Sequence, residues 1–267
     1  MATTQSTTET NHRPLFQAQR QDEITSLAIA QGRVDVAELA ERFAVTTETI
    51  RRDLSELQER KVLRRVHGGA VPWERLRFEP LLAVRGDLHH AEKRRIGALA
   101  VHELPDGGTV LIDSGSTTAQ FCEALPRDRP LTVVTNSLLN AQVLADFKHA
   151  EVIVLGGMLR KNTMAMVDAQ AVGMVERLTV DALFISCDGM SASRGLTTPY
   201  QYESTLKQAM IRAARRVIVL ADHSKLDNDQ LFRFADWSDV DVLIADTGVD
   251  EADFEELQSI VPVVHRA

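Results

Sequence analysis

The chain has few cysteines, few aromatic residues and no recognisable metal-binding pattern. Of its 267 residues only two are cysteines, Cys122 and Cys187, and 5% are aromatic. The two cysteines lie far apart and match no metal-binding spacing, so we interpret them as buried thiols in a reducing compartment. The eight histidines form no ligand pattern either. We therefore expect neither a metal site nor a cofactor.

The chain also lacks the features of a membrane or exported protein. It has no apolar run long enough to cross a bilayer and no charged-then-apolar signal peptide. The expectation is a soluble cytoplasmic protein without a membrane partner. A formal net charge of −8 argues against a protein that coats nucleic acid by bulk electrostatics. With 267 residues and 44% hydrophobic content, two domains with sizeable cores are expected.

One segment nevertheless has the pattern of a helix that lies in a DNA groove. Apolar residues recur at helical spacing between Val45 and Leu57, and polar residues occupy the other face. A shorter helix, Val36 to Phe43, precedes it, with Asp35 as its N-cap and Glu38 three residues further on, as in a capping box. Only two residues separate these helices, which predicts a helix-turn-helix.

The second helix is followed by a predicted hairpin wing, Lys61 to Val71, with Gly68-Gly69 between its two strands. Basic residues outnumber acidic ones from Arg51 to Val71, so DNA binding should be local, moderately salt-dependent and sequence-selective. A plain amphipathic surface helix is the simpler alternative, and the conjunction of two helices, turn and wing favours DNA. The predicted contacts to base edges or phosphates are Thr46, Thr47, Glu48, Thr49, Arg51, Arg52, Arg64, Arg65, His67 and Gly68.

Composition predicts the domain boundaries. Residues 1–14 are polar and form a predicted disordered tail. Residues 15–71 form the winged helix-turn-helix domain, whose first helix runs from Phe16 to Gln31 and stops at Gly32. Periodicity is lost between Pro72 and Glu92, so residues 72–92 are a predicted linker, and residues 93–267 form the second domain.

The second domain alternates apolar strands with helical segments, and each strand ends in a polar or glycine-rich turn. Strands that are apolar on both faces, with helices between them, predict an α/β fold with a mostly parallel sheet covered on both sides. The predicted strands are residues 110–112, 131–134, 152–155, 182–185, 217–220 and 242–244.

Ligands of such sheets bind beyond the carboxyl ends of the strands. The turn Asp113 to Thr118 places one glycine and three consecutive hydroxyl residues between a strand and a helix, which suits a phosphate at the helix N-terminus. Lys225 and Arg160 follow strand ends and could supply the cation. The alternative is a helix N-cap with extra hydroxyls, with Lys225 as a solvated loop residue.

These motifs give the chain a family resemblance. The run Thr49-Ile50-Arg51-Arg52-Asp53-Leu54, followed by Val66-His67-Gly68-Gly69-Ala70, resembles the winged helix-turn-helix of the DeoR family of bacterial transcriptional repressors. The later series from Asp113 to Lys225 is similar to the effector domain of this family. That domain resembles ribose-5-phosphate isomerase and binds phosphorylated sugars or related metabolites in the family.

Carried over position by position, the resemblance implies an effector site made from the strand-end turns. The phosphate would lie on the 114–118 turn, and the remaining residues would line the site or contact hydroxyls and phosphate. The implied residues are Asp113, Ser114, Gly115, Ser116, Thr117, Thr118, Thr135, Asn136, Gly156, Gly157, Arg160, Asp188 and Lys225.

The sequence departs from the family pattern at two positions. Lys61 and Asp168 stand where the family commonly has glycine, so the entry to the wing and the loop after Arg160 are expected to differ. Glu203 and Lys207 lie four apart on a predicted helix from Tyr202 to Arg215, where an i,i+4 ion pair is the simplest account and a site role for Lys207 is open.

The combined hypothesis is a repressor of a carbohydrate-metabolism operon, without enzymatic activity, that binds double-stranded operator DNA under the control of a phosphorylated sugar. Two-fold operators favour a homo-oligomer, a dimer or tetramer. Two alternatives stay open. The α/β domain could be a sugar-phosphate isomerase-like enzyme using Asp113, Asp188 or Asp222 as a base, or its site could be vestigial.

Overall fold

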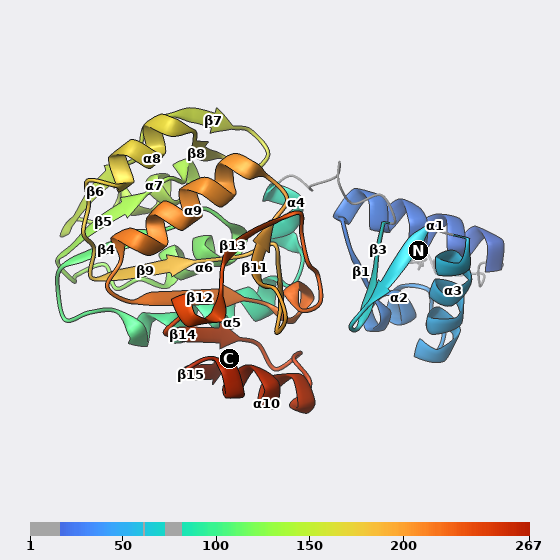
Figure 1. The fold of residues 1–267 in the computed structure, drawn as a ribbon. Coiled ribbons are helices and arrows are strands. Elements are labelled where there is room, and N and C mark those ends of the chain that lie inside the picture. The colour runs from blue at the N-terminus through green and yellow to red at the C-terminus, as the bar shows by residue number, and fades with distance from the viewer. Residues whose placement is uncertain (1–16, 61, 73–81) are drawn as a thin grey trace, which may run out of the picture. The chain divides into compact units, whose positions relative to one another are not determined.

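The computed structural model describes residues 17–60, 62–72 and 82–267 (Figure 1). The chain divides into two compact units, Met1–Arg75 and Leu76–Ala267. The predicted tail, Lys61 and residues 73–81 of the predicted linker lie outside the described residues. Within the described part, no helix combines the length and apolar character needed to cross a membrane.

Three helices and a small sheet build the first unit. Their bounds are α1 (Gln17–Gln31), α2 (Val36–Arg42), α3 (Thr47–Glu59), β1 (Val34–Asp35), β2 (Leu63–Val66) and β3 (Gly69–Pro72). Asp35 caps α2 by accepting hydrogen bonds from the backbone N–H groups of Ala37 at 2.7 Å and Glu38 at 3.4 Å. Thr46 caps α3 by accepting one from Thr49 N–H at 3.2 Å. Both predicted N-caps are confirmed.

A buried ion pair joins α1 to the packed face of α3. Arg20 Nε lies 2.6 Å from Asp53 Oδ2, and both side chains are buried. Ile24 of α1 and Ile50 and Leu54 of α3 complete the contact and are fully buried. The exposed face of α3 is therefore held in a fixed orientation by its opposite, packed face.

The wing differs from its predicted form in one detail. The sheet order is β1-β3-β2, with antiparallel pairs, and β2 and β3 are joined by His67 and Gly68 alone. Gly69 belongs to β3, where it pairs with Asp35 and Val66. The prediction that Gly68-Gly69 forms the turn is wrong, because Gly68, with φ of +67°, is the glycine that the turn requires.

A seven-stranded parallel sheet organises the second unit, in the order β15-β14-β12-β9-β4-β5-β6. The strands are β4 (Thr109–Ile112), β5 (Leu131–Thr135), β6 (Ala150–Val154), β9 (Ala182–Ile185), β12 (Val217–Ala221), β14 (Val242–Ala245) and β15 (Val263–Arg266). The mostly parallel α/β fold is confirmed. The sequence missed β15, an edge strand whose side chains are half-buried or exposed and mixed in polarity.

Helices cover both faces of this sheet, as Figure 1 shows. Alternate residues of β4 point to opposite cores: Val110 and Ile112 pack with α5, α6 and α7, and Leu111 packs with α8, α9 and α10. The helices are α5 (His90–Ala100), α6 (Ser116–Ala124), α7 (Leu138–Leu144), α8 (Ala169–Val175), α9 (Gln201–Ala213) and α10 (Glu251–Ile260), with short 3-10 helices η2 (Val101–Glu103), η3 (His223–Lys225) and η4 (Trp237–Asp239).

Two small antiparallel sheets extend this unit, and the sequence did not predict them. One pairs β7 (Met158–Arg160) with β8 (Ala165–Val167), and the other has the order β10-β11-β13, with bounds Gly189–Ser191, Gly195–Thr198 and Phe232–Ala235. Their strands are three or four residues long. Such short strands leave no usable alternation pattern.

The predicted linker, residues 72–92, is helical over part of its length. Helix α4 (Leu82–Asp87) lies within it, and α5 begins at His90. Leu82 is buried, and its N–H group donates a hydrogen bond to Asn162 O at 2.8 Å. Helix α4 was not predicted from the sequence, because a six-residue helix containing Gly86 has little intrinsic stability. It depends on tertiary contacts such as those of Leu82.

Asp168 has a strained backbone conformation, and its side chain makes hydrogen bonds that offset the strain. Its φ is +100° and its ψ is −176°, a region that residues other than glycine rarely adopt. Its carboxylate caps α8 by accepting hydrogen bonds from Gln170 N–H at 2.8 Å and Ala171 N–H at 3.3 Å. It also accepts one from Met158 N–H at 3.0 Å, which ties β7 to α8.

Substitution of Asp168 separates these two effects. Asp168→Ala loses the cap and keeps the strain, whereas Asp168→Gly loses the cap and relieves the strain. Because the strain costs about 1–3 kcal/mol, we expect the glycine variant to be more stable than the alanine variant by about that amount. Urea unfolding of both variants measures the difference, and equal stabilities would show that Asp168 is not strained.

Candidate functional site

The exposed face of α3 forms a groove with the wing. Its lining residues come from the first three turns of α3 and from β2: Thr46, Glu48, Thr49, Arg51, Arg52, Ser55 and Arg65. Arg65 joins the two elements, because its Nη1 donates to Ser55 Oγ at 3.0 Å and its backbone N–H donates to Gln58 Oε1 at 2.9 Å. Six of the residues predicted to contact DNA therefore lie on one surface.

The arginines of this groove are only loosely paired. Arg51 lies 3.6 Å from Glu48 and Arg52 lies 3.8 Å from Glu56, and both guanidinium groups are exposed. Exposed pairs of this kind contribute about 0–1 kcal/mol. Both arginines can therefore exchange their carboxylate partners for a phosphate or a guanine edge at low cost.

The other predicted contacts lie beside the groove. Thr47 and Arg64 are exposed, on α3 and β2 respectively. His67 and Gly68 form the tip of the wing, where Arg33 Nη2 donates to His67 O at 2.6 Å. The sequence did not point to Arg33, which precedes β1 and becomes a wing-positioning residue only when the sheet forms.

In the second unit the polar turns meet where the strand order reverses. From β4 the chain continues outward to β5 and β6, and it then returns to β9 on the other side of β4. Open α/β sheets bind ligands at the carboxyl ends of such a strand pair. The turn after β4 begins at Asp113 and the turn after β9 at Ser186, and Ser186 Oγ donates to Ser114 O at 3.4 Å.

The N-terminus of α6 lies at this point without a side-chain cap among the described residues. Gly115 occupies the N-cap position with φ of +151°, and a Cβ atom there would lie 2.5 Å from Ser186 Oγ, so only glycine fits. Ser116, Thr117 and Thr118 follow, and all three are buried. Uncapped first-turn N–H groups at the positive end of a helix dipole are suited to an anion.

A buried cation lies beside this helix N-terminus. Lys207, on α9, donates hydrogen bonds from Nζ to Asp113 Oδ2 and, at 2.8 Å, to Ser186 O. Burial lowers the pKa of Lys207, but Asp113, Asp188 and Glu203 raise it more, so its pKa lies above the ordinary value and the group is charged. Lys207 thus connects the turns after β4 and β9.

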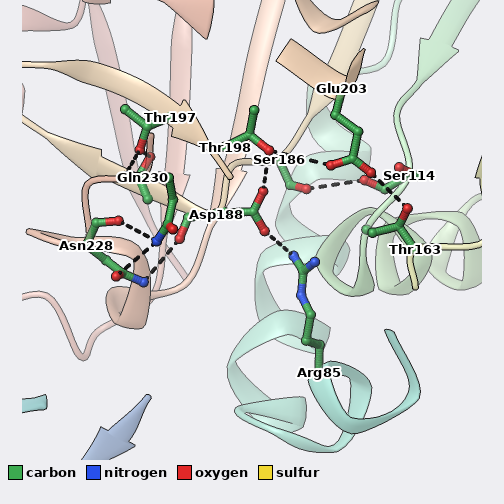
Figure 2. A network of polar contacts seen from close by, with 12 residues as sticks. Arg85, Ser114, Thr163, Ser186, Asp188, Thr197, Thr198, Glu203, Asn228 and Gln230 are labelled. Atoms are coloured by element: carbon green, nitrogen blue, oxygen red, sulfur yellow. Dashed lines mark hydrogen bonds and ion pairs between the residues drawn. The ribbon is translucent and has the colours of Figure 1, made fainter. Parts of the chain in front are cut away.

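A second ion pair closes the neighbouring turn (Figure 2). Asp188 Oδ1 lies 2.9 Å from Arg85 Nη2 of α4, and Asp188 Oδ2 accepts a hydrogen bond from Thr198 Oγ1 at 2.8 Å. Burial raises the pKa of Asp188, but Arg85, Lys207 and Lys225 together with the Thr198 hydroxyl lower it below its usual value. Asp188 is therefore an ionised carboxylate.

The predicted i,i+4 pair between Glu203 and Lys207 is wrong, since each residue pairs with another element instead. Glu203 Oε1 lies 3.1 Å from Arg160 Nη1 and accepts a hydrogen bond from Thr163 Oγ1 at 2.8 Å. These contacts tie α9 to the loop between β7 and β8. Arg160, predicted as a phosphate ligand, is thus engaged by a carboxylate and by the Tyr200 ring, 4.3 Å from its guanidinium carbon.

Other predicted site residues have structural roles. Thr135 Oγ1 donates to Ile112 O at 2.7 Å, and Asn136 Oδ1 accepts from Ser114 N–H at 2.9 Å, which orders the turn after β4. Gly156 N–H lies 3.2 Å from the Met174 sulfur, and a Cβ atom on Gly157 would collide with Val167 O at 2.7 Å. Gly157 therefore allows the β6–β7 connection to pack closely against β8, and Gly156 lies against α8.

Lys225 lies in η3, after β12, and is half-buried. Within the described residues, no carboxylate lies at ion-pair distance from its ammonium group, although Lys225 lowers the pKa of both Asp222 and Asp188. Burial raises the pKa of Asp222, but the charges of Lys225 and Lys93 lower it by more. The pKa of Asp222 therefore lies below its usual value, and this carboxylate is ionised. The Lys225 ammonium group can therefore still donate hydrogen bonds to a ligand at the carboxyl edge of the sheet.

The helix-turn-helix groove and the α/β unit with its strand-end site define a DNA-binding transcriptional regulator with a sensor domain. Residues 20–75 match the model of the DeoR-like helix-turn-helix domain, and residues 88–247 match that of the DeoR C terminal sensor domain. The chain belongs to the DeoR family.

Relatives cover nearly the whole chain. It is 34% identical over 245 residues to the HTH-type transcriptional regulator GlpR of Haloferax volcanii, covering 92% of this chain and 96% of that protein. It is 31% identical to the HTH-type transcriptional repressor GlcR of Bacillus subtilis, covering 87% and 89%. Among solved structures, ribose 5 phosphate isomerase A from Neisseria gonorrhoeae shares 20% identity at a TM-score of 0.38, covering 50% of this chain and 52% of that one.

Proposed function

We propose that this protein is a repressor of carbohydrate-metabolism genes whose affinity for operator DNA is set by a phosphorylated sugar bound in the second unit. The names of its relatives support the gene class. They include a putative aga operon transcriptional repressor of Escherichia coli O157:H7, 29% identical, and an L-fucose operon activator of Haemophilus influenzae, 30% identical.

The observation that carries the proposal is the uncapped N-terminus of α6 at the point where the strand order reverses. A phosphate there would accept hydrogen bonds from first-turn N–H groups, as anions do at other helix N-termini. The buried hydroxyls of Thr117 and Thr118 lie on the same turn, and the Lys207 ammonium lies beside it. The carboxylates of Asp113 and Asp188 could accept hydrogen bonds from sugar hydroxyls.

Charge at the site favours a phosphorylated ligand over a neutral sugar. Lys207 is neutralised by Asp113, and Arg85 by Asp188. The half-buried Lys225 adds a positive charge that is shared with Asp222 and Asp188 rather than paired at short range. A phosphate dianion can pair with Lys225 as a point charge.

The DNA half of the proposal rests on the groove of α3 and the wing. A pair of such surfaces in a two-fold oligomer would read two half-sites about one helical turn, or a multiple of it, apart. An effector that favours one spacing of the two surfaces would then change operator affinity. Couplings of about 1–3 kcal/mol are typical and correspond to roughly 5- to 150-fold.

Thermal unfolding of the full chain against a panel of sugar phosphates tests the ligand class. The panel includes ribose 5-phosphate, fructose 1-phosphate, fructose 6-phosphate, glucose 6-phosphate and glycerol 3-phosphate, with the parent sugars and inorganic phosphate as controls. A ligand at one hundred times its Kd adds about 2.7 kcal/mol to the native state. A rise in Tm with a phosphorylated compound, and none with its parent sugar, is expected. No rise with any phosphorylated compound would contradict the proposal.

Lys225→Ala separates sensing from DNA binding. Because Lys225 lies in the second unit and makes no short ion pair with a described residue, its removal should leave the fold and the DNA-binding groove intact. We expect retained DNA affinity and a loss of about 10-fold or more in affinity for the stabilising sugar phosphate, as for a charge-assisted hydrogen bond of about 1.5–3 kcal/mol.

Lys148→Ala is the matched control, since Lys148 is an exposed lysine of the same unit that precedes β6, at the opposite edge of the sheet. Isothermal titration with the sugar phosphate and fluorescence anisotropy with DNA measure the two affinities. Unchanged affinity for the sugar phosphate in Lys225→Ala would remove Lys225 from the site.

A further inference from the structure

Arg85 lies beside the predicted effector site, near the start of the second unit and close in sequence to the DNA-binding unit. Helix α4 is the first described element after the DNA-binding unit, and only nine residues, 73–81, separate it from β3. The Arg85 side chain nevertheless lies at the carboxyl edge of the parallel sheet, 2.9 Å from Asp188, and only 12% of it is exposed (Figure 2). The predicted effector site and the connection to the DNA-binding unit therefore share one ion pair.

Helix α4 is fastened to the strand-end loops by two further contacts. Leu82 N–H donates to Asn162 O, in the β7–β8 loop that follows Arg160 and also carries Thr163. The Lys93 ammonium donates to Arg85 O and Leu88 O, at 2.5 Å each, and lies 3.9 Å from Asp222 Oδ2. Burial lowers the pKa of Lys93 to about 8. The β7–β8 loop and the turn after β9 thus contact α4 directly, and Lys93 of α5 connects it to Asp222 after β12.

The Asp188 carboxylate pairs with the Arg85 guanidinium group as an anionic group of a ligand would. A guanidinium group presents five N–H donors in a planar fork that binds carboxylates and phosphates alike. One Asp188 oxygen is engaged by Arg85 and the other by Thr198, so the carboxylate has two fixed partners. A phosphate arriving nearby would repel this carboxylate and attract the guanidinium group at the same time.

We infer that Arg85 binds the phosphate or another anionic group of the effector, and that its exchange of Asp188 for this group shifts α4 and so transmits binding to the DNA-binding unit. This inference rests on the proposed function and adds the residue that couples the two sites. The ion pair between Arg85 and Asp188 holds α4 against the turn after β9. Substitution of either partner of this ion pair should therefore have the same effect on DNA affinity as binding of the effector.

Two variants of the full-length protein test this exchange. Arg85→Gln removes the charge that the ligand would attract, and Asp188→Asn removes the carboxylate that it would displace. Arg215→Gln is the matched control, since Arg215 is an exposed arginine 3.7 Å from Asp181 in the same unit. Anisotropy measures the affinity of each protein for a duplex that the wild-type protein selects from a random pool. Each titration is made with inorganic phosphate, with each sugar phosphate of the panel, and without either.

In the wild-type and Arg215→Gln proteins, at least one sugar phosphate should change DNA affinity by roughly 5- to 150-fold. In Arg85→Gln and Asp188→Asn, the same compound should change it less than about twofold. Without the compound, both variants should already show DNA affinity shifted toward that of the saturated wild type. Arg85→Lys, which keeps the charge but not the fork, covers the case in which Arg85→Gln does not fold, and should respond less than the wild type.

Hydrogen exchange of the wild-type protein gives an independent readout. The backbone amides of α4 should exchange faster when the stabilising sugar phosphate is added, because the contacts that hold α4 are released. A full response in Arg85→Gln, with unchanged exchange in α4, would overturn the inference and leave the proposed function standing. A wild-type protein whose stability and DNA affinity respond to no compound would overturn both.

Discussion

Replacement of Lys207 by methionine is expected to abolish sugar-phosphate binding and to lower the stability of the second unit by about 3–5 kcal/mol. Lys207 is buried, and its ammonium group neutralises the buried Asp113 carboxylate and holds the turns after β4 and β9 together. Without it, Asp113 is a buried charge without its cation. Chemical unfolding and titration with the stabilising sugar phosphate measure the two effects.

The double variant Asp113→Asn, Lys207→Met distinguishes the contribution to binding from the contribution to stability. Removing both charges of a buried pair costs much less than removing one, so most of the lost stability should return. Ligand binding should not return, because the ammonium group beside α6 is still absent. A double variant that binds the sugar phosphate as the wild type does would show that this pair has only a structural role.

Arg51→Ala is expected to weaken specific DNA binding by roughly 5- to 150-fold, corresponding to about 1–3 kcal/mol for one base or phosphate contact. Its guanidinium group lines the groove and is held only by the loose pair with Glu48. Folding should be unaffected, since the packed face of α3 is unchanged. Anisotropy with the selected duplex and with a scrambled duplex measures the loss and its sequence dependence.

Arg42→Ala provides a closely matched control. Arg42, at the end of α2, is 54% exposed at its side chain and pairs with Glu23 at 3.6 Å, whereas Arg51 is 55% exposed and pairs with Glu48 at 3.6 Å. Arg42 lies outside the groove of α3 and the wing. Equal losses of DNA affinity in the two variants would contradict the assignment of α3 as the recognition helix.

The first unit could be predicted closely because its signals are local in sequence. Asp35 and Thr46 mark helix starts through side chains that cap their own helices, and the apolar spacing of Ile50 and Leu54 gives the buried face of α3. The wing turn was misplaced by one residue, because two adjacent glycines offer two possible turns. Pairing of Gly69 with Asp35 of β1, a long-range contact, decides between them.

The sensor site could be predicted only in part because its charges come together through tertiary structure. The turn from Asp113 to Thr118 was identifiable, since the strand, glycine and hydroxyl residues follow one another. Lys207 meets Asp113 across 94 positions of the chain, and no local pattern marks that contact. Arg85 was missed for a further reason, because its helix is too short to show periodicity and the surrounding segment has the composition of a linker.

Arg160 is a predicted site residue whose partners could not be predicted from the sequence. Its position after a predicted strand end suggested a cation that could contact phosphate. In the structure Glu203 and the face of Tyr200 engage its guanidinium group, so a phosphate there would share Arg160 with these partners. Lys225, by contrast, has no short ion pair with a described residue, and its effector role stays a prediction.

The central claim is that the sugar phosphate and the DNA bind to coupled sites, and the most direct test is a pair of titrations of the wild-type protein. Coupling free energy is reciprocal. If the stabilising sugar phosphate changes the Kd for the selected duplex by some factor, the duplex must change the Kd for that sugar phosphate by the same factor, and roughly 5- to 150-fold is expected. A sugar phosphate that binds with the same Kd in the presence and absence of the duplex would contradict the account.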